Sequence, residues 1–202
     1  MNKPKITAVI FDADGMIVHG ERFSLRLEKE HGIPLEVTKP FFIGPFQECV
    51  VGKADLKQEL EKVARTWKWN KSIDLLLQYW FMDICNKVDL RFREEIGRLR
   101  ATGIKCFLAS NNEKYRTNYL TEQRGIGGWF DKVYSSAYVG FKKPEQEFFS
   151  AILADYPGLK KSEVQFWDDD PENIQGAKEF GLAVELFTDF ENFKSVSDKL
   201  VR

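Results

Sequence analysis

The segment Ile6-Thr-Ala-Val-Ile-Phe-Asp-Ala-Asp-Gly15 carries the clearest indication of the fold in this chain. Its first six residues form a short apolar run, rich in β-branched side chains, that stops abruptly at Asp12 and Asp14. Apolar runs of this length without polar alternation are typical of strands buried in parallel sheets. Open parallel sheets bind their ligands at the carboxyl ends of the strands. The stretch therefore predicts a buried strand with chemistry directly after it.

Four later segments have the same character, and helical patterns lie between them. The further predicted strands are residues 104–110, 132–135, 164–168 and 182–187. Apolar side chains recur at helical spacing in residues 91–102, 145–154 and 171–180. Asp170 is placed to cap the last of these helices, with Pro171 at its first position. Strands that alternate with helices predict the α/β class, here a Rossmann-like parallel five-stranded sheet sandwiched by helices.

Residues 16–88 break this alternation, because they contain no convincing strand. Apolar side chains recur at helical spacing in residues 55–67 and again in 73–84. Core packing also explains most of the aromatic residues of this stretch better than a substrate pocket does; these are Phe41, Phe42, Phe46, Trp67, Trp69, Tyr79, Trp80 and Phe81. We therefore expect a small helical cap at 16–88 on a catalytic core formed by 1–15 and 89–202, with the substrate entering between them.

The composition excludes several classes of partner. The 202 residues include 30 basic and 31 acidic ones, so the formal net charge of −1 favours neither nucleic acid nor an anionic membrane surface as partner. No stretch approaches the length of a membrane span, and the three cysteines form no CxxC pair. These features predict a cytoplasmic protein with reduced, buried thiols. Two histidines argue against a clustered zinc site, and the sequence does not distinguish a monomer from a homodimer.

Polar residues follow four of the predicted strands, where a parallel sheet binds ligands. They are Asp12 and Asp14, Ser110 and Asn111, Lys142 to Pro144, and Asp168 to Asp170. Two carboxylates about 4 Å apart repel by roughly 4 kcal/mol at an effective dielectric constant near 20, so gathering these aspartates against one lysine is costly without a cation. Hard oxygen ligands suit magnesium rather than zinc or copper. The sequence thus predicts a Mg²⁺ site beside a receptacle for a phosphoryl group, which one carboxylate can attack.

Four motifs resemble, in order and spacing, those of the haloacid dehalogenase (HAD) superfamily. They are FDADG at 11–15, LASNN at 108–112, GFKKPEQEFF at 140–149 and FWDDDPENI at 166–174. The resemblance is to the phosphatase-like subgroup with a small helical cap of the C1 type. Dehalogenases of the superfamily lack an acid at the position of Asp14, because a halide leaving group needs no proton. The presence of Asp14 favours phosphate chemistry.

The resemblance implies a role in the reaction for three of the matching residues. Asp12 would attack phosphorus and ligate magnesium through its other oxygen. Asp14 would protonate the leaving alcohol and then activate the hydrolytic water, while its backbone carbonyl touches the metal. Lys143 would neutralise charge on the nucleophile and the phosphate.

Binding roles follow in the same way. Ser110 and the backbone N–H of Asn111 would hold the phosphate oxygens. Asp169 would ligate the metal directly, and Asp168 would do so through water. Asn173 stands where many members of the superfamily have another acid. The implied activity is magnesium-dependent hydrolysis of a small phosphomonoester through an aspartyl-phosphate.

Two other functions fit the same motifs. A phosphomutase shares the chemistry but returns the phosphoryl group to a sugar, and a non-catalytic regulatory or binding protein can keep the fold. Several residues have plainer interpretations: Asn112 as a helix cap, Lys142 and His19 as surface residues. Sugar phosphates, phosphoglycolate-like acids and nucleoside monophosphates all stay open as substrates.

Overall fold

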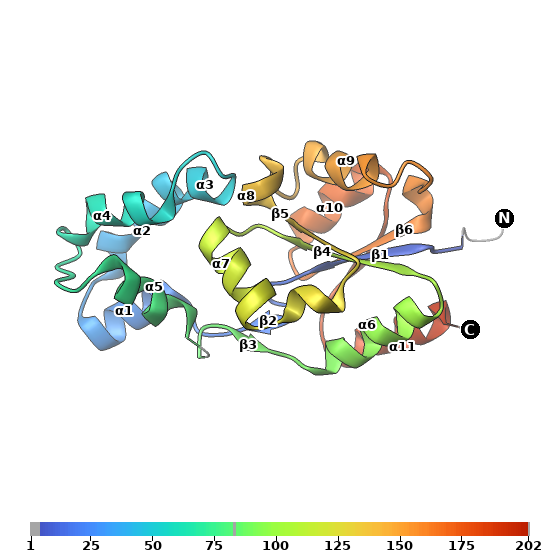
Figure 1. Ribbon diagram of the computed structural model, residues 1–202, viewed down its shortest axis with the longest axis horizontal. Helices are drawn as coiled ribbons and strands as arrows, with labels where there is room; N and C mark the ends of the chain where they lie inside the picture. Colours follow the sequence, from blue (N-terminus) through green and yellow to red (C-terminus); the bar gives the residue numbers. More distant parts are fainter. Residues whose placement is uncertain (1–4, 83, 202) are drawn as a thin grey trace.

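The computed structural model describes residues 5–82 and 84–201, which are the coloured parts of the ribbon in Figure 1. Five parallel strands form the central sheet in the order β5-β4-β1-β6-β7. Their bounds are β1 (Ala8–Asp12), β4 (Lys105–Ser110), β5 (Lys132–Ser135), β6 (Val164–Asp168) and β7 (Ala183–Leu186). All five lie where the sequence predicts them, so the predicted α/β class and five-stranded parallel sheet are confirmed.

The register of the sheet brings three motifs together. β1 is the middle strand, and its last residue Asp12 pairs with Ala109, one residue before the end of β4. On its other side β1 pairs with β6, where Phe11 lies opposite Trp167. The carboxyl ends of β4, β1 and β6 therefore lie side by side, and Ser110, Asp12 and Asp168 end those strands.

Helices cover both faces of the sheet, as Figure 1 shows. α6 (Arg91–Ala101) and α11 (Phe190–Leu200) share one hydrophobic cluster with Val9 and Phe11 of β1. α9 (Gln146–Ala154) and α10 (Pro171–Phe180) share another with Ala8 and Ile10. Successive residues of β1 thus enter opposite layers, as the pleat of a strand requires. The sheet is buried on both sides, which explains why its strands lack polar alternation.

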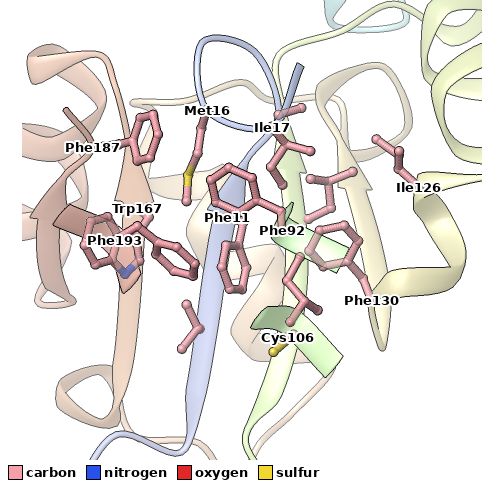
Figure 2. Packing of buried hydrophobic residues seen from close by; sticks show 14 of the residues in the cluster. Phe11, Met16, Ile17, Phe92, Cys106, Ile126, Phe130, Trp167, Phe187 and Phe193 are labelled. Atoms are coloured by element: carbon pink, nitrogen blue, oxygen red, sulfur yellow. The ribbon is translucent and has the colours of Figure 1, made fainter. Parts of the chain in front are cut away.

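Aromatic rings pack against one another in the layer between the sheet and α11 (Figure 2). Phe193 lies with its ring centroid 5.7 Å from that of Phe11 and 5.2 Å from that of Trp167. Both contacts are edge-on, the geometry that aromatic rings prefer. Trp167 therefore fills the core directly before the acidic residues that end β6.

Short helices connect the remaining strands. They are α7 (Lys114–Asn118), a π-helical turn (Tyr119–Gln123), 3₁₀ turns (Ile126–Trp129 and Lys161–Glu163) and α8 (Ser136–Val139). The predicted cap of α10 is confirmed, because the Asp170 side chain accepts a hydrogen bond from Glu172 N at 2.9 Å. The predicted cap at Asn112 is wrong. Glu113 caps α7 instead, accepting from the backbone N–H groups of Tyr115 and Arg116 at 2.6 Å.

Five helices between β1 and α6 pack around a hydrophobic cluster of their own, which contains the predicted aromatic core. They are α1 (Phe23–His31), α2 (Leu35–Ile43), α3 (Pro45–Val50), α4 (Leu56–Ala64) and α5 (Ile73–Phe81). α5 ends sooner than the periodicity of 73–84 predicts, because Met82 is extended. In Figure 1 this group lies beyond the labels of α7 and α8, at the opposite end from the termini. We call it the helical insertion.

The expectation that residues 16–88 contain no strand is wrong. Val18–His19 (β2) and Lys87–Val88 (β3) form a short antiparallel pair that joins the two connections of the helical insertion. Two-residue strands are too short to produce a periodic pattern, and their partners are far apart in the chain. Met16 and Ile17 belong to the sheet's hydrophobic cluster rather than to that of the insertion. The predicted domain boundary at 15/16 stays a prediction.

Several polar contacts hold the helical insertion against the sheet domain. The buried Ser136 hydroxyl donates to Val50 O at 2.6 Å, and Lys142 Nζ donates to Gln47 Oε1 at 2.8 Å. Gly52 lies so close to Ala137 that a Cβ at position 52 would be 2.1 Å from its carbonyl oxygen. The end of α3 is therefore fixed on α8.

Two other expectations concern cysteines and membranes. Cys49 and Cys106 are free and buried as predicted, but free Cys85 is only half-buried and its Sγ accepts a hydrogen bond from Arg26 Nη1 at 3.1 Å. Within residues 5–82 and 84–201, no helix has both the length and the apolar character that a bilayer crossing needs.

Candidate active site

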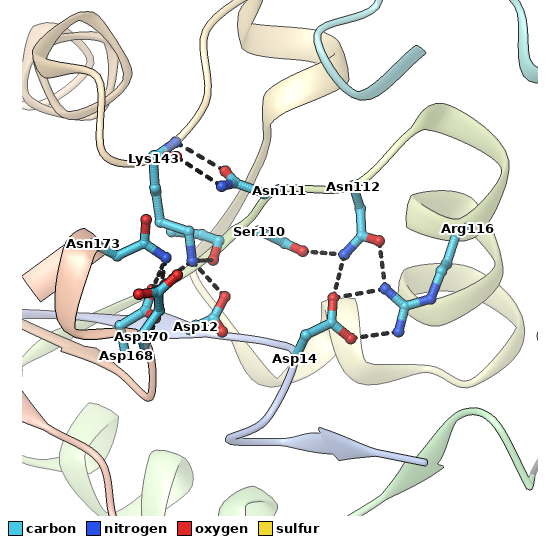
Figure 3. Close-up of polar contacts among 11 residues, drawn as sticks. Asp12, Asp14, Ser110, Asn111, Asn112, Arg116, Lys143, Asp168, Asp170 and Asn173 are labelled. Carbon is cyan, nitrogen blue, oxygen red and sulfur yellow. Dashed lines mark hydrogen bonds and ion pairs between the residues drawn. The ribbon is translucent and has the colours of Figure 1, made fainter. Parts of the chain in front are cut away.

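Lys143 and Asp12 form the buried centre of the site drawn in Figure 3. Asp12 is 5% exposed and Lys143 is 2% exposed. The Lys143 ammonium donates to Asp12 Oδ1, to Asp168 Oδ2 at 2.7 Å and to Ala109 O at 3.1 Å. All three of its donors are thus used, by groups at the ends of β1, β4 and β6. Lys142, predicted to be a surface residue, is half-buried instead, because its ammonium donates to Gln47 of the helical insertion.

Asn111 fixes the backbone of Lys143. Its side-chain Nδ2 donates to Lys143 O at 2.8 Å, while its Oδ1 accepts from Lys143 N at 2.9 Å. This two-way amide contact ties the loop before Pro144 to the end of β4. The sequence predicts a phosphate-binding role only for the backbone N–H of Asn111, so the side-chain role is an addition.

Asp168 is fully buried and its carboxylate is surrounded by donors. Oδ1 accepts from Asp170 N at 2.9 Å, and both oxygens accept from Asn173 Nδ2, at 3.2 and 3.1 Å. With the bond from Lys143, these contacts satisfy a charge that would otherwise be costly to bury. Asn173, at the position where many superfamily members have an acid, thus acts here as a donor to Asp168.

Asp169 is exposed, and its carboxylate approaches the backbone after β1. A Cβ on Gly15 would lie 1.9 Å from Asp169 Oδ2, and Gly15 itself has a φ of +80°. Only glycine leaves room for that carboxylate and adopts this backbone conformation without strain. Asp12, Asp168 and Asp169 each offer an oxygen within 4.8 Å of the other two. These three carboxylates fit a hard divalent cation such as Mg²⁺.

The electrostatics of this cluster favour a cation. Burial raises the pKa of Asp12 to about 8, against the opposing attraction of Lys143 and with the help of the Asp168 charge. Partial loss of solvent around the Asp169 carboxylate and the charge of the neighbouring Asp168 also raise the pKa of Asp169. Burial disfavours the charge of Lys143 too, but its attraction to Asp12 and Asp168 outweighs that cost and raises its pKa. One ammonium does not balance three acids, so an added cation stabilises their ionised forms.

Asp14 faces a different partner, Arg116 of α7. Arg116 Nη1 donates to Asp14 Oδ2 at 2.7 Å and Nη2 donates to Oδ1, which makes a two-pronged ion pair (Figure 3). Asn112 Nδ2 adds a third bond, to Oδ2 at 2.8 Å. Partial burial opposes the charge of Asp14, but Arg116 and Asn112 outweigh it and hold the pKa of that carboxyl below its ordinary value.

The last predicted residue, Ser110, is buried at the end of β4. Its Oγ accepts a hydrogen bond from Asn112 Nδ2, the group that also bonds Asp14. Asn112 therefore links Ser110 to Asp14 across the strand ends, and this contact replaces its predicted role as a cap. The sequence contains no signal for Arg116, because it follows the SNN motif without a motif or a periodicity of its own.

Two cavities meet at Asp14. One, of ≈ 750 Å³, contains Asp12, Lys143 and the acidic residues 168–170. The other, of ≈ 530 Å³, is lined by Asn86, Asn112 and Arg116 together with aromatic residues of the helical insertion. Asp14, Gly15, Arg22 and Asn111 line both cavities. The predicted surface residue His19 is exposed and borders the second cavity, as do Phe46 and Trp80.

The family model of the haloacid dehalogenase-like hydrolases matches residues 6–181, most of the sheet and all of the helical insertion. The chain belongs to this family. The family resemblance, the fold class and the hydrolase class expected from the sequence are therefore confirmed.

Among curated proteins, D-ribitol-5-phosphate phosphatase of Bacteroides thetaiotaomicron is 26% identical over 197 residues, which cover 88% of this chain and 89% of that protein. A sesquiterpene phosphatase of Aspergillus oryzae is 27% identical over 105 residues, covering 52% of this HAD chain and 53% of that protein. The names of these two relatives refer to different kinds of substrate, a polyol phosphate and a sesquiterpene.

Solved structures of HAD proteins share the fold. A HAD-like hydrolase of Porphyromonas gingivalis superposes with a TM-score of 0.82 at 23% identity, with 98% of each chain covered. A HAD enzyme of Bacteroides thetaiotaomicron, in complex with magnesium and inorganic phosphate, superposes with a TM-score of 0.79 at 19% identity, covering 93% of this chain and 98% of that one. At these identities the likeness concerns the fold alone.

Proposed function

We propose that this HAD hydrolase is a magnesium-dependent phosphatase that hydrolyses a small phosphomonoester through a phosphorylated Asp12. One observation carries the proposal: the carboxylate of Asp12 ends the central strand in a cavity that also holds Lys143 and the acidic pair Asp168 and Asp169. A nucleophile, a fixed cation and a cation-binding cluster are the groups that phosphoryl transfer to a carboxylate needs. The related ribitol-phosphate phosphatase supports this class of substrate.

The proposed reaction has two steps. A carboxylate oxygen of Asp12 attacks phosphorus, and the ester P–O bond breaks as its oxygen keeps the bonding pair and takes a proton from Asp14. Asp14 then removes a proton from water, whose oxygen attacks phosphorus. The P–O bond to Asp12 breaks, which releases inorganic phosphate and restores the Asp12 carboxylate and the Asp14 acid.

The other predicted residues hold charge in place. Lys143, fixed through Asn111, would neutralise the phosphoryl oxygens near Asp12, and Ser110 with the backbone N–H of Asn111 would bind those oxygens. Asp12, Asp168 and Asp169 would hold Mg²⁺, with the Asp14 backbone carbonyl as a further ligand. When bound, the ion offsets negative charge on the phosphoryl group and the nucleophile.

The lining of the second cavity favours a substrate whose leaving group is small and partly polar. Its wall combines amide and guanidinium groups of Asn86, Asn112 and Arg116 with the rings of Phe46 and Trp80. Since the helical insertion supplies those rings, we propose that residues 16–88 act as the cap that selects the substrate. A polyol or sugar phosphate, which presents both hydroxyl groups and carbon atoms, fits this mixed lining better than a long apolar chain, which would remove water from the polar part of the wall without adding hydrogen bonds.

The proposed phosphatase activity is tested by measuring the release of inorganic phosphate. Purified protein is incubated with a panel of polyol, sugar, carboxylic-acid and nucleoside monophosphates, with magnesium or with chelator. We expect magnesium-dependent release of phosphate that Asp12→Asn abolishes. Asp189→Asn is the matched control, because Asp189 caps α11 and its substitution removes the same charge outside both cavities. Release by Asp12→Asn at the wild-type rate would refute the proposed nucleophile.

Two alternatives have their own outcomes in the same assay. Formation of an isomeric sugar phosphate without phosphate release would identify a phosphomutase. If the wild-type protein neither releases phosphate nor forms an isomer from any compound of the panel, with or without magnesium, a non-catalytic binding protein would be favoured.

A further inference from the structure

Arg116 is a largely buried cation that the proposed reaction does not use. Its side chain is 13% exposed and lies on α7, outside the four motifs. Besides its two bonds to Asp14, Nη1 donates to Asn112 Oδ1, and Nε donates to Asn86 Oδ1 at 2.8 Å. Four of its five N–H donors are thus occupied, all by oxygens that border the second cavity.

The pattern of bonds leaves one oxygen of Asp14 accessible. Oδ2 accepts from both Arg116 and Asn112, whereas Oδ1 accepts from Arg116 alone among the described residues. A carboxylate oxygen has about two lone-pair positions. Oδ1 therefore keeps a position for a proton, while the remaining contacts fix the plane of the carboxylate. Because the ion pair itself favours the ionised form of Asp14, Arg116 can aid proton exchange only through the position of that carboxyl group.

Asp14 needs such support because its side chain is 45% exposed and lies where the two cavities meet. An unsupported carboxylate there would be free to rotate into either cavity. The planar guanidinium grips both oxygens at once, which a lysine ammonium does not do. Asn86 fixes the other edge of the guanidinium, and its own Nδ2 donates to Trp80 O at the end of α5. The grip therefore depends on the helical insertion as well as on α7.

We propose that Arg116 is the positioning residue that holds Asp14 for proton exchange with the leaving-group oxygen. This role rests on the proposed phosphatase function, in which Asp14 gives that oxygen its proton. Arg116 acts through Asp14 rather than on phosphorus, since it lines the second cavity and not the one that holds Asp12 and Lys143. Because Arg116 is bonded to Asn86, the position of Asp14 also depends on how the helical insertion packs against the sheet domain.

The test compares leaving groups that differ in their need for a proton. An alkyl phosphate such as a polyol phosphate requires protonation of its leaving oxygen, whereas the phenolate of p-nitrophenyl phosphate leaves without it. We expect Arg116→Met to lower kcat on the alkyl phosphate about 100-fold, within the range of general acid catalysis. The release of the first equivalent of p-nitrophenol, measured by rapid mixing, is expected to change less than about 5-fold, on the order of 1 kcal/mol or less. KM for both substrates is expected to stay within about 3-fold.

Three further variants separate positioning from a structural role. Arg116→Lys keeps the positive charge but cannot donate to both oxygens of Asp14 as a planar guanidinium does. Its kcat on the alkyl phosphate is expected to lie between those of Arg116→Met and the wild type. The double variant with Asp14→Asn is expected to be no slower on the alkyl phosphate than Asp14→Asn alone, because both changes remove one function. Arg98→Met is the matched control, since Arg98 pairs with Glu95 and Asp198 outside both cavities.

Each result has one meaning. Equal losses on the two substrates, additive losses in the double variant, or full recovery with lysine would overturn the role of Arg116 while leaving the phosphatase intact. A large rise in KM with unchanged kcat would also overturn it, because Arg116 would then bind the leaving group directly. A wild-type protein inactive on both substrates would refute the proposed function and this role together.

Discussion

Replacing Gly15 by alanine is expected to drive Asp169 out of the acidic cluster. The new Cβ would lie 1.9 Å from Asp169 Oδ2, whereas ordinary contact begins at 3.4 Å, so the carboxylate must retreat by about 1.5 Å. The side chain can rotate, so the protein is expected to fold. Asp12 and Asp168 would then remain as a two-carboxylate site.

The backbone cost of this change can be separated from its effect on the cluster. Gly15 has a φ of +80°, and alanine in this left-handed region costs roughly 1–2 kcal/mol. Gly103 has a φ of +88°, and a Cβ added there would meet no atom of the described residues within 4 Å. Gly103→Ala therefore carries the backbone strain alone and is the matched control.

Magnesium binding is the property that should differ. Disturbing the support of a metal site typically weakens affinity about 10- to 100-fold. At a magnesium concentration 100 times the wild-type Kd, the ion stabilises the folded protein by about 2.7 kcal/mol, and a Kd that is 10- to 100-fold weaker reduces this to about 1.4–0.4 kcal/mol. For a chain of this length, 1 kcal/mol corresponds to roughly 2–4 °C in Tm.

The assay is thermal unfolding with and without magnesium, together with calorimetric titration of the ion. We expect Gly103→Ala to lower Tm yet keep the wild-type increase with magnesium, while Gly15→Ala loses half or more of that increase. If Gly15→Ala binds magnesium as tightly as Gly103→Ala, then Asp169 is not a ligand and the argument from its approach to Gly15 is wrong.

Two further predictions concern stability. Burial raises the pKa of Glu113 from 4.5 to about 7, so between these values the folded protein holds a proton that the unfolded chain has released. Stability from this group is complete below pH 4.5 and is lost as pH rises through 7, by on the order of 3 kcal/mol. Glu113→Gln should flatten that decline in urea titrations at pH 5 and pH 8; an unchanged slope would contradict the assignment. Phe193→Ala should lower the free energy of unfolding by about 3–5 kcal/mol, because Phe193 is 1% exposed and packs on Phe11 and Trp167. Phe141→Ala, at a position that is 43% exposed, should change it by roughly 0.5 kcal/mol or less, and equal losses would refute the argument.

Local patterns were sufficient for most of the fold. Every strand of the main sheet is a short run of apolar residues, because both faces of a parallel sheet are buried. The helices of the insertion show their apolar spacing for the same reason, since each packs one face on a shared core. β2 and β3 escaped prediction because their pairing is set by how the insertion returns to the sheet, not by any local pattern.

The strand ends that carry Asp12, Ser110 and Asp168 could be predicted from local patterns, because parallel strands with alternating helices place their carboxyl ends on one edge. The surroundings of these residues could not be predicted, because they depend on tertiary packing. Whether Asn112 caps a helix or bridges Ser110 to Asp14, and whether Arg116 grips Asp14, depends on where side chains from distant segments point. Hydrogen bonds need their atoms within about 3 Å at a suitable angle, and no spacing in a sequence specifies that across different elements.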